Sequence, residues 1–331
     1  MRTITLEEHY ATPAFMDGPG HQIRQEAEAA RAHPQVAAGL ARLIEQLCDI
    51  GEGRIATMDA AGLDLQVLSL TYPGVEQLDP VEAVALARDT NDTLAEAVRR
   101  HPDRLAGFAA LPTPDPEAAA DELQRAVGEH GFKGALINGH SRGRCLDDEF
   151  FWPILACAET LGVPLYLHPT PPPPSVITGL YAGNYPSQVA GVLATAAWGW
   201  HLDTALHVLR LILSGALDRY PGLQLVIGHL GETLPFMLPR LERALPTELT
   251  NLDRPVSAYL RENVHYTVSG FNWTPAFLDR LLQVGADRIM FSTDYPYGSM
   301  AEARTFLDQL PVSAADKERI VHGNAERLLR L

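Results

Sequence analysis

The feature that most constrains the fold is a series of short apolar runs, rich in β-branched residues, that alternate with longer segments of helical periodicity. Short apolar runs separated by helices are typical of βα units, whose strands lie side by side in a parallel sheet. The eight predicted strands span residues 2–6, 65–70, 105–110, 134–137, 164–167, 223–227, 264–268 and 288–291. The clearest predicted helices span residues 80–100, 116–130, 150–161, 202–219, 234–243, 275–284, 300–310 and 313–329.

Eight strands with intervening helices in a chain of 331 residues close most simply into an α/β fold of the (β/α)8 or TIM-barrel type. We therefore expect one barrel domain over residues 1–331. An open, doubly wound sheet is the competing fold, but no strand is followed by the G-x-G-x-x-G turn that marks many such sheets.

Two segments interrupt the alternation and predict long loops after the first and fifth strands. Residues 11–50 begin with several helix-breaking prolines and glycines, and residues 169–200 contain the run PTPPPP. Loops that follow barrel strands lie on the catalytic face. We expect both loops to shape a pocket, with a surface insertion or a subunit contact as the alternative.

Composition excludes several classes of partner. The net charge of −15 comes from acidic residues scattered along the helices, so no basic stripe is present to bind a nucleic acid backbone. No apolar stretch is long enough to span a membrane, and no signal peptide is apparent. The three cysteines, Cys48, Cys145 and Cys157, lack metal-type spacing and are expected to be reduced thiols. We expect a cytoplasmic protein.

Polar residues follow most of the predicted strands, at the positions that face the catalytic end of a barrel. They are Glu7, Glu8, His9, Asn138, His168, His229, Ser269, Ser292, Thr293 and Asp294. Because successive strand residues point to opposite faces, Glu7 and His9 are expected on one side and Glu8 on the other.

Four of these residues predict a metal site. Glu7 and His9 can bind one ion together with His168 and Asp294, which end two other strands. Two imidazoles and two carboxylates without a thiolate suit Zn²⁺ or Mn²⁺, and an open coordination position would make the site catalytic.

Other polar residues have candidate roles outside the metal shell. His229 is expected to orient or deprotonate a bound group, whereas Glu232 could instead favour the start of a helix. Arg240 could bind an anionic substrate or remain a solvated helix charge. His207 lies in a helical pattern and is interpreted as a packing residue, and His201 is assigned no role.

The sequence resembles the amidohydrolase superfamily, and within it the ortho-hydroxybenzoate decarboxylases that act on γ-resorcylate, 2,3-dihydroxybenzoate and 5-carboxyvanillate. The resemblance covers nearly the whole chain. Its most diagnostic stretches are LEEHY at 6–10, GFKGALINGH at 131–140, VPLYLHP at 163–169, LRLILSGALDRYPGLQLVIGHLGETLPFMLPR at 209–240 and GADRIMFSTDYP at 285–296. Most relatives begin with His-x-His, so the Glu-x-His start favours the decarboxylase group.

The resemblance implies a role for each site residue. Glu7, His9, His168 and Asp294 would be the ligands of one divalent metal ion, Zn²⁺ or Mn²⁺. His229 and Glu232 would lie beside the metal, and Asn138 and Arg240 would bind the substrate.

The reaction implied is the non-oxidative decarboxylation of a hydroxylated aromatic acid, with Asp294 as the proton donor and a homodimer or homotetramer as the assembly. One alternative is a metal-dependent hydrolase of a lactone, an amide or a related carbonyl compound. The other is a non-catalytic barrel with a closed metal site.

Overall fold

A computed structural model describes residues 1–29 and 34–331 of the chain. Its strands form two parallel sheets, ordered β1-β2-β3 and β4-β5-β6-β7-β8-β9. The strands are β1 (Ile4–Tyr10), β2 (Leu65–Leu70), β3 (Leu105–Gly107), β4 (Ala109–Ala110), β5 (Ala135–Asn138), β6 (Leu165–His168), β7 (Leu225–Ile227), β8 (Val264–Thr267) and β9 (Ile289–Met290).

Strands β3 and β4 together form the predicted strand at residues 105–110. Residues 105–107 pair with β2, and residues 109–110 pair with β5. Phe108 separates the two short strands, and its backbone N–H donates to the Leu68 carbonyl at 2.9 Å. The chain therefore passes from one sheet to the other within this strand, and the eight predicted strands are confirmed.

The junction between β9 and β1 is held by individual hydrogen bonds. In the described part of the chain no strand ladder joins these two strands. Instead, the His9 N–H donates to the Tyr295 carbonyl at 2.7 Å, and the Glu7 N–H donates to the Ser292 hydroxyl at 2.8 Å. These bonds link the first strand to the segment after the last one, which is consistent with a (β/α)8 barrel.

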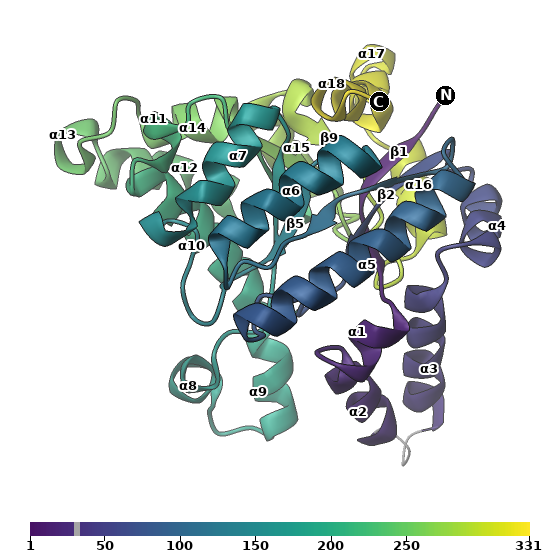
Figure 1. Cartoon of the computed structure of the whole chain (residues 1–331). Coiled ribbons are helices and arrows are strands. Elements are labelled where there is room, and N and C mark those ends of the chain that lie inside the picture. Colours follow the sequence, from purple (N-terminus) through teal and green to yellow (C-terminus); the bar gives the residue numbers. More distant parts are fainter. Residues whose placement is uncertain (30–33) are drawn as a thin grey trace.

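Helices surround the strands (Figure 1). Their bounds are α1 (Pro13–Asp17), α2 (His21–Ala29), α3 (Pro34–Cys48), α4 (Glu52–Ala61), α5 (Pro80–Arg100), α6 (Pro116–His130), α7 (Trp152–Leu161), α8 (Pro174–Val176), α9 (Ser187–Ala194), α10 (Gly199–Leu213), α11 (Ala216–Arg219), α12 (Leu234–Ala244), α13 (Thr247–Thr250), α14 (Val256–Glu262), α15 (Thr274–Val284), α16 (Met300–Asp308), α17 (Ala314–Glu318) and α18 (Asn324–Leu329). The predicted helix at 202–219 is divided between α10 and α11 because Gly215 has a left-handed φ of 76°.

The sequence predicts long loops at residues 11–50 and 169–200, but both segments contain helices. The first contains α1, α2 and α3, with residues 30–33 outside the described part, and the second contains α8 and α9. Pro13 occupies the first turn of α1, where the missing N–H of proline costs nothing, and the Thr12 hydroxyl caps that helix. Figure 1 shows both segments on the side of the molecule where β1 ends.

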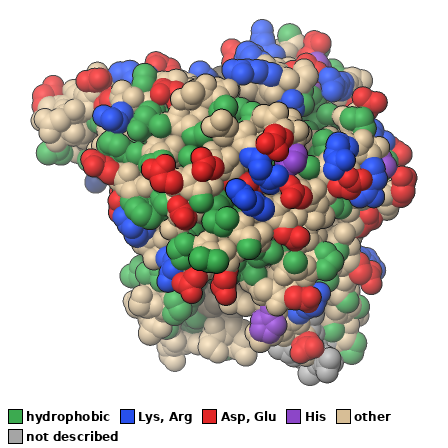
Figure 2. Space-filling view, viewed as in Figure 1, with side chains coloured by type: hydrophobic (Ala, Val, Ile, Leu, Met, Phe, Trp, Pro, Cys, Tyr) green, Lys and Arg blue, Asp and Glu red, His purple; other side chains and the backbone are tan. Residues whose placement is uncertain are grey.

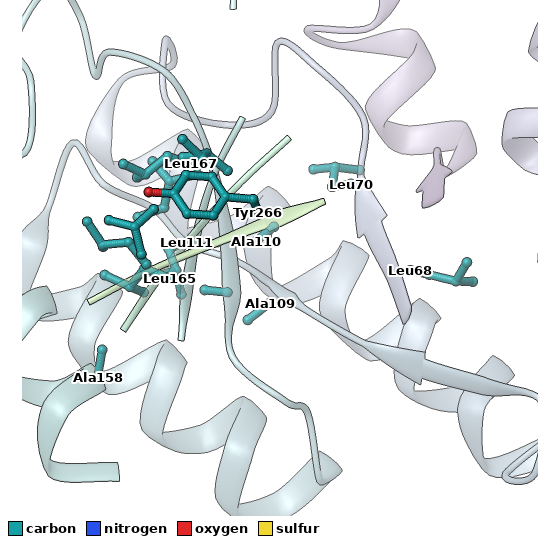
Figure 3. Close-up of a cluster of buried hydrophobic side chains, with 14 of the residues drawn as sticks. Leu68, Leu70, Ala109, Ala110, Leu111, Ala158, Leu165, Leu167 and Tyr266 are labelled. Atoms are coloured by element: carbon teal, nitrogen blue, oxygen red, sulfur yellow. The ribbon is translucent and has the colours of Figure 1, made fainter. Parts of the chain in front are cut away.

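Alternating strand residues divide the apolar interior into two clusters. One cluster fills the barrel with a residue from nearly every strand, including Ile4, Leu6, Phe108 and Tyr166. The other lies between the strands and the helices and includes Leu165 and Leu167 of β6 and Ala158 of α7 (Figure 3). Tyr166 and His168 therefore face the barrel interior, since they alternate with Leu165 and Leu167.

Charged residues of both signs are mixed on the surface shown in Figure 2, with hydrophobic side chains between them. Among the described residues, no helix combines the length and apolar character needed to cross a membrane.

His207 of α10 provides a prediction about stability. It is buried, and its Nε2 accepts a hydrogen bond from the Leu146 N–H at 2.9 Å, which requires the neutral ring. Burial lowers the pKa of His207 to about 4, from the usual histidine value of 6.5. The unfolded chain therefore binds a proton between these values that the folded chain does not, so stability falls as the pH drops from 6.5 towards 4.

We expect wild-type protein to lose about 2 kcal/mol more unfolding free energy between pH 7 and pH 5 than His207→Gln, which keeps an acceptor but does not titrate. Urea unfolding at the two pH values measures this difference. Equal losses in both proteins would contradict the assignment of a neutral, buried His207.

Candidate metal centre and active site

The four predicted metal ligands converge at the carboxyl ends of three strands. Glu7 and His9 belong to β1, His168 ends β6, and Asp294 follows β9. One donor atom from each lies within 4.8 Å of the others. The His9 Nε2 and Asp294 Oδ1 atoms are 3.2 Å apart, and the His168 Nε2 and Glu7 Oε1 atoms are 3.3 Å apart.

A β-bulge in β1 determines which residues face this site. The register with β2 shifts by one residue between Thr5 and Glu8. Before the shift, Ile4 and Leu6 face the apolar interior. Uninterrupted alternation would turn Glu7 away from it, but the extra residue reverses the alternation, so Glu7 and His9 also face inward. The prediction that Glu7 and His9 share a side is confirmed.

The Glu7 carboxylate presents two different oxygens. Hydroxyl groups of Tyr166, Ser269 and Thr267 all donate to Oε2. Within the described ranges, residues 1–29 and 34–331, Oε1 is buried without a hydrogen-bond partner. Gly228 lies so close that a Cβ atom there would be 2.4 Å from Oε2, so only glycine leaves room for the carboxylate. This arrangement holds one oxygen in place and leaves the other to bind an ion.

His9 is also suited to metal binding. Both of its ring nitrogens are buried and have no hydrogen-bond partner among the residues that the structure describes. Burial lowers the pKa of His9 to about 4, which keeps the ring neutral, as a metal ligand must be. Buried polar atoms without partners are rare and costly, and a cation shared with Glu7 would satisfy the His9 Nε2, the nitrogen that faces Asp294. The donor set therefore fits a divalent metal ion.

Asn138 supports His168, one of the four predicted ligands. The His168 Nδ1 lies 3.0 Å from the Asn138 Oδ1, so the amide orients the imidazole with its Nε2 towards Glu7. Asn138 is held in turn by Glu76, which accepts its backbone N–H at 2.7 Å. Asn138 was predicted to bind the substrate, but in the structure its nearest site partner is His168.

Asp294 is the predicted ligand closest to open space. Its side chain is 17% exposed, whereas those of Glu7 and His9 are fully buried. Burial, together with the charge of Glu7, raises the pKa of Asp294 to about 7. Burial alone would raise the pKa of Glu7 as well, but the charge of His229 and the nearby His168 ring outweigh it and lower that pKa.

Glu8 points away from the site, as predicted, and stabilises it through hydrogen bonds with Thr293. Its carboxylate accepts hydrogen bonds from the Thr293 N–H at 2.9 Å and the Thr293 hydroxyl at 2.6 Å. The buried Arg54 donates to the His9 carbonyl at 2.6 Å. Glu8 thus joins β1 directly to the segment that carries Asp294.

His229 and Glu232 lie beside the four ligands. The His229 Nε2 is 3.7 Å from the Glu7 Oε1, and its Nδ1 is 2.7 Å from the Glu232 Oε1. Burial lowers the pKa of His229, but the charges of Glu232 and Glu7 outweigh it and raise the pKa to about 10. His201, which sequence reasoning missed, lies 2.6 Å from the other oxygen of Glu232.

The site opens into a cavity of about 320 Å³. Its walls combine polar site residues with aromatic rings from several loops. The lining residues are Tyr72, His168, Pro169, Ala196, Trp200, His201, His229, Gly270, Phe271, Asp294 and Tyr297. Aromatic residues in loops carry no positional signal in one sequence, so these walls could not be predicted.

Arg240 lies apart from this cavity. It is exposed on α12, and it is not among the residues that line the cavity. The structure therefore brings together seven of the eight predicted site residues, with Asn138 one contact behind His168 and Arg240 outside.

Comparisons with known proteins identify what the chain is similar to. A γ-resorcylate decarboxylase of Polaromonas sp. strain JS666 is 37% identical over 340 residues, which cover 99% of this chain and 98% of that protein. A crystal structure of 2,6-dihydroxybenzoate decarboxylase complexed with 2,6-dihydroxybenzoate has a TM-score of 0.89 and 36% identity, and the match covers all of both chains.

A 5-carboxyvanillate decarboxylase of Novosphingobium aromaticivorans, complexed with manganese and 4-hydroxy-3-methoxy-5-nitrobenzoic acid, has a TM-score of 0.89 and 37% identity; the match covers 100% of this chain and 96% of that one. The amidohydrolase family model matches residues 24–331. The chain therefore belongs to the amidohydrolase family, in the group that contains the γ-resorcylate decarboxylases.

Proposed function

We propose that the protein is a carboxy-lyase that removes CO2 from an ortho-hydroxylated aromatic acid without a redox change. The observation that carries this function is the cluster of Glu7, His9, His168 and Asp294 at the base of an aromatic-walled cavity of about 320 Å³. The relatives named above, which act on γ-resorcylate and 5-carboxyvanillate, support the same substrate class.

One divalent ion would be held by Glu7, His9, His168 and Asp294, and the manganese in the related decarboxylase favours Mn²⁺ over Zn²⁺. When bound, such an ion supplies positive charge that stabilises the substrate's carboxylate and phenolate oxygens. Tyr72 and Tyr297, whose ring centroids lie 5.8 Å apart, form part of the aromatic wall against which a planar acid can pack.

Asp294 would act as the general acid. It lines the cavity, so its carboxyl group can deliver a proton to an acid bound there. Transfer of this proton to the ring carbon that bears the carboxylate interrupts the aromatic system. The C–C bond to the carboxylate then breaks, its electron pair returns to the ring, and CO2 leaves.

His229 and Glu232 would transfer the proton of the substrate's phenol group. The His229 Nε2 faces the cavity beside Glu7, and Glu232 holds the opposite ring nitrogen. Asn138 would act on the substrate by orienting His168. Substrate binding by Arg240 remains a prediction. The Arg240 side chain is exposed and does not line the cavity.

We also propose a homodimer or homotetramer in the cytoplasm. Large apolar side chains such as Trp198 and Phe236 are 50% and 79% exposed, which supports a subunit interface. The three free cysteines support a reducing compartment. The hydrolase alternative is not favoured, because these relatives are decarboxylases.

The first prediction concerns the substrate. Protein loaded with Mn²⁺ is expected to release CO2 from at least one member of a panel containing 2,6-dihydroxybenzoate, 2,3-dihydroxybenzoate and 5-carboxyvanillate. Benzoate, which lacks the ortho hydroxyl, is the control and should not react. The same protein is also incubated with lactones, and CO2 release and lactone ring opening are measured separately. Hydrolysis of lactones without any CO2 release would replace this function with the hydrolase alternative.

The second prediction concerns the proton donor. Asp294→Asn is expected to lower kcat by at least about 100-fold, because an amide cannot supply the proton. Metal content is measured alongside, so that loss of the ion is separated from loss of the acid. A metal-loaded variant with a rate near that of the wild type would remove Asp294 from the mechanism.

The third prediction concerns the metal. Chelation should abolish turnover and lower the melting temperature, and added Mn²⁺ should restore both, because an ion bound only to the folded state stabilises it. His9→Ala and His168→Ala should fail to retain Mn²⁺ in equilibrium dialysis. His21→Ala, which changes an exposed histidine, is the matched control. Full retention of Mn²⁺ by both ligand variants would argue against this site.

A further inference from the structure

We infer that His201 is a positioning residue that aligns His229 for the reaction by holding the far oxygen of Glu232. This inference rests on the proposed function. His201 belongs to the first turn of α10, whereas Glu232 and His229 belong to the turn after β7. It therefore connects the helix that follows the second long segment to the side chains beside the metal ligands.

The contacts form a continuous chain. The His201 Nδ1 is 2.6 Å from the Glu232 Oε2, and the His229 Nδ1 is 2.7 Å from the Glu232 Oε1. At the other end, the His229 Nε2 faces Glu7 at 3.7 Å. Each carboxylate oxygen accepts from one imidazole, so the plane of the carboxylate is fixed by two donors rather than one.

Burial makes the second donor necessary. Glu232 is 1% exposed, so water cannot easily replace a lost donor at Oε2. A buried carboxylate oxygen without a partner pays its full desolvation penalty and tends to rotate towards another donor. Such a rotation would move Oε1 away from the His229 Nδ1 and release the ring that faces the cavity.

The backbone gives the same picture of a segment that needs outside support. His229, Leu230, Glu232 and Thr233 all have left-handed φ values between 50° and 69°. Non-glycine residues rarely adopt this conformation, and it persists only where surrounding contacts enforce it. The His201 contact is one of those that fix the side chains of this turn.

A second metal ion is the competing interpretation of the same three residues, whose donor atoms lie within 4.8 Å of one another. The hydrogen bonds argue against it. Both Glu232 oxygens are already occupied by imidazole nitrogens at 2.6 and 2.7 Å. The His201 Nε2 is also engaged, because it accepts a hydrogen bond from the Trp200 indole N–H at 3.3 Å. The three groups thus satisfy one another without an ion.

The experiment compares His201→Phe with His201→Asn. Phenylalanine keeps a ring of similar size but cannot donate, whereas the asparagine Nδ2 takes nearly the position of the histidine Nδ1 and can donate to Glu232. We expect His201→Phe to lower kcat by about 10- to 100-fold with little change in KM, as for other residues that orient catalytic groups. His201→Asn should recover most of this loss. His207→Gln in the same helix is the control and should keep the wild-type kcat.

A double variant tests whether His201 acts through Glu232. In a Glu232→Gln background, His201→Phe should cause little further loss, because residues that act as a unit are not additive. An undiminished loss in that background would overturn the inference. So would wild-type kcat in His201→Phe, or an effect confined to KM, which would instead make His201 a substrate contact.

A measurement without turnover separates this inference from the proposed function. In protein labelled with ¹⁵N-histidine, the His229 Nδ1–H should give a downfield, exchange-protected resonance in the wild type and in His201→Asn. The resonance should shift or disappear in His201→Phe. An unchanged resonance would overturn the inference, whereas absence of CO2 release from every acid in the panel would overturn only the proposed function.

Discussion

The one-residue bulge in β1 is the constraint on which the rest of the site depends. A strand with strict alternation can present either Leu6 or Glu7 to the barrel interior, but not both. The bulge allows an apolar floor and a polar site to follow each other along one strand, because Leu6 closes the core and Glu7 begins the ligand set. A deletion that restored regular alternation would turn both Glu7 and His9 out of the site.

The two neighbouring carboxylates of this strand do opposite work. Glu7 faces inward, where three hydroxyl groups hold one oxygen and the other is left for an ion. Glu8 faces outward and binds Thr293, next to Asp294, across the junction where the strand ladder is interrupted. The position of Asp294 relative to His9 therefore depends on a residue that never faces the cavity.

Much of this arrangement could be predicted from the sequence, because strands and ligands follow local rules. The eight strands appear as apolar runs, and Glu7, His9, His168 and Asp294 follow from their places at strand ends. The bulge could not be predicted, since it depends on pairing with β2. His201 and Asn138 also differ from expectation, because their partners, Glu232 and His168, are distant in sequence and only the folded chain brings them together.

In this enzyme, the residues that would bind the metal and the residues that form the cavity walls come mostly from different parts of the chain. The four proposed ligands lie on strands of the barrel or shortly after one, whereas the cavity walls include Pro169 and Ala196 from the segment between β6 and α10 and Trp200 from the first turn of α10. That segment begins directly after His168 and contains none of the four proposed ligands. Replacement of its residues would change the cavity wall and leave those ligands in place. Changes in this segment could thus alter which substrate fits the cavity. The segment would still have to place His201 in contact with Glu232.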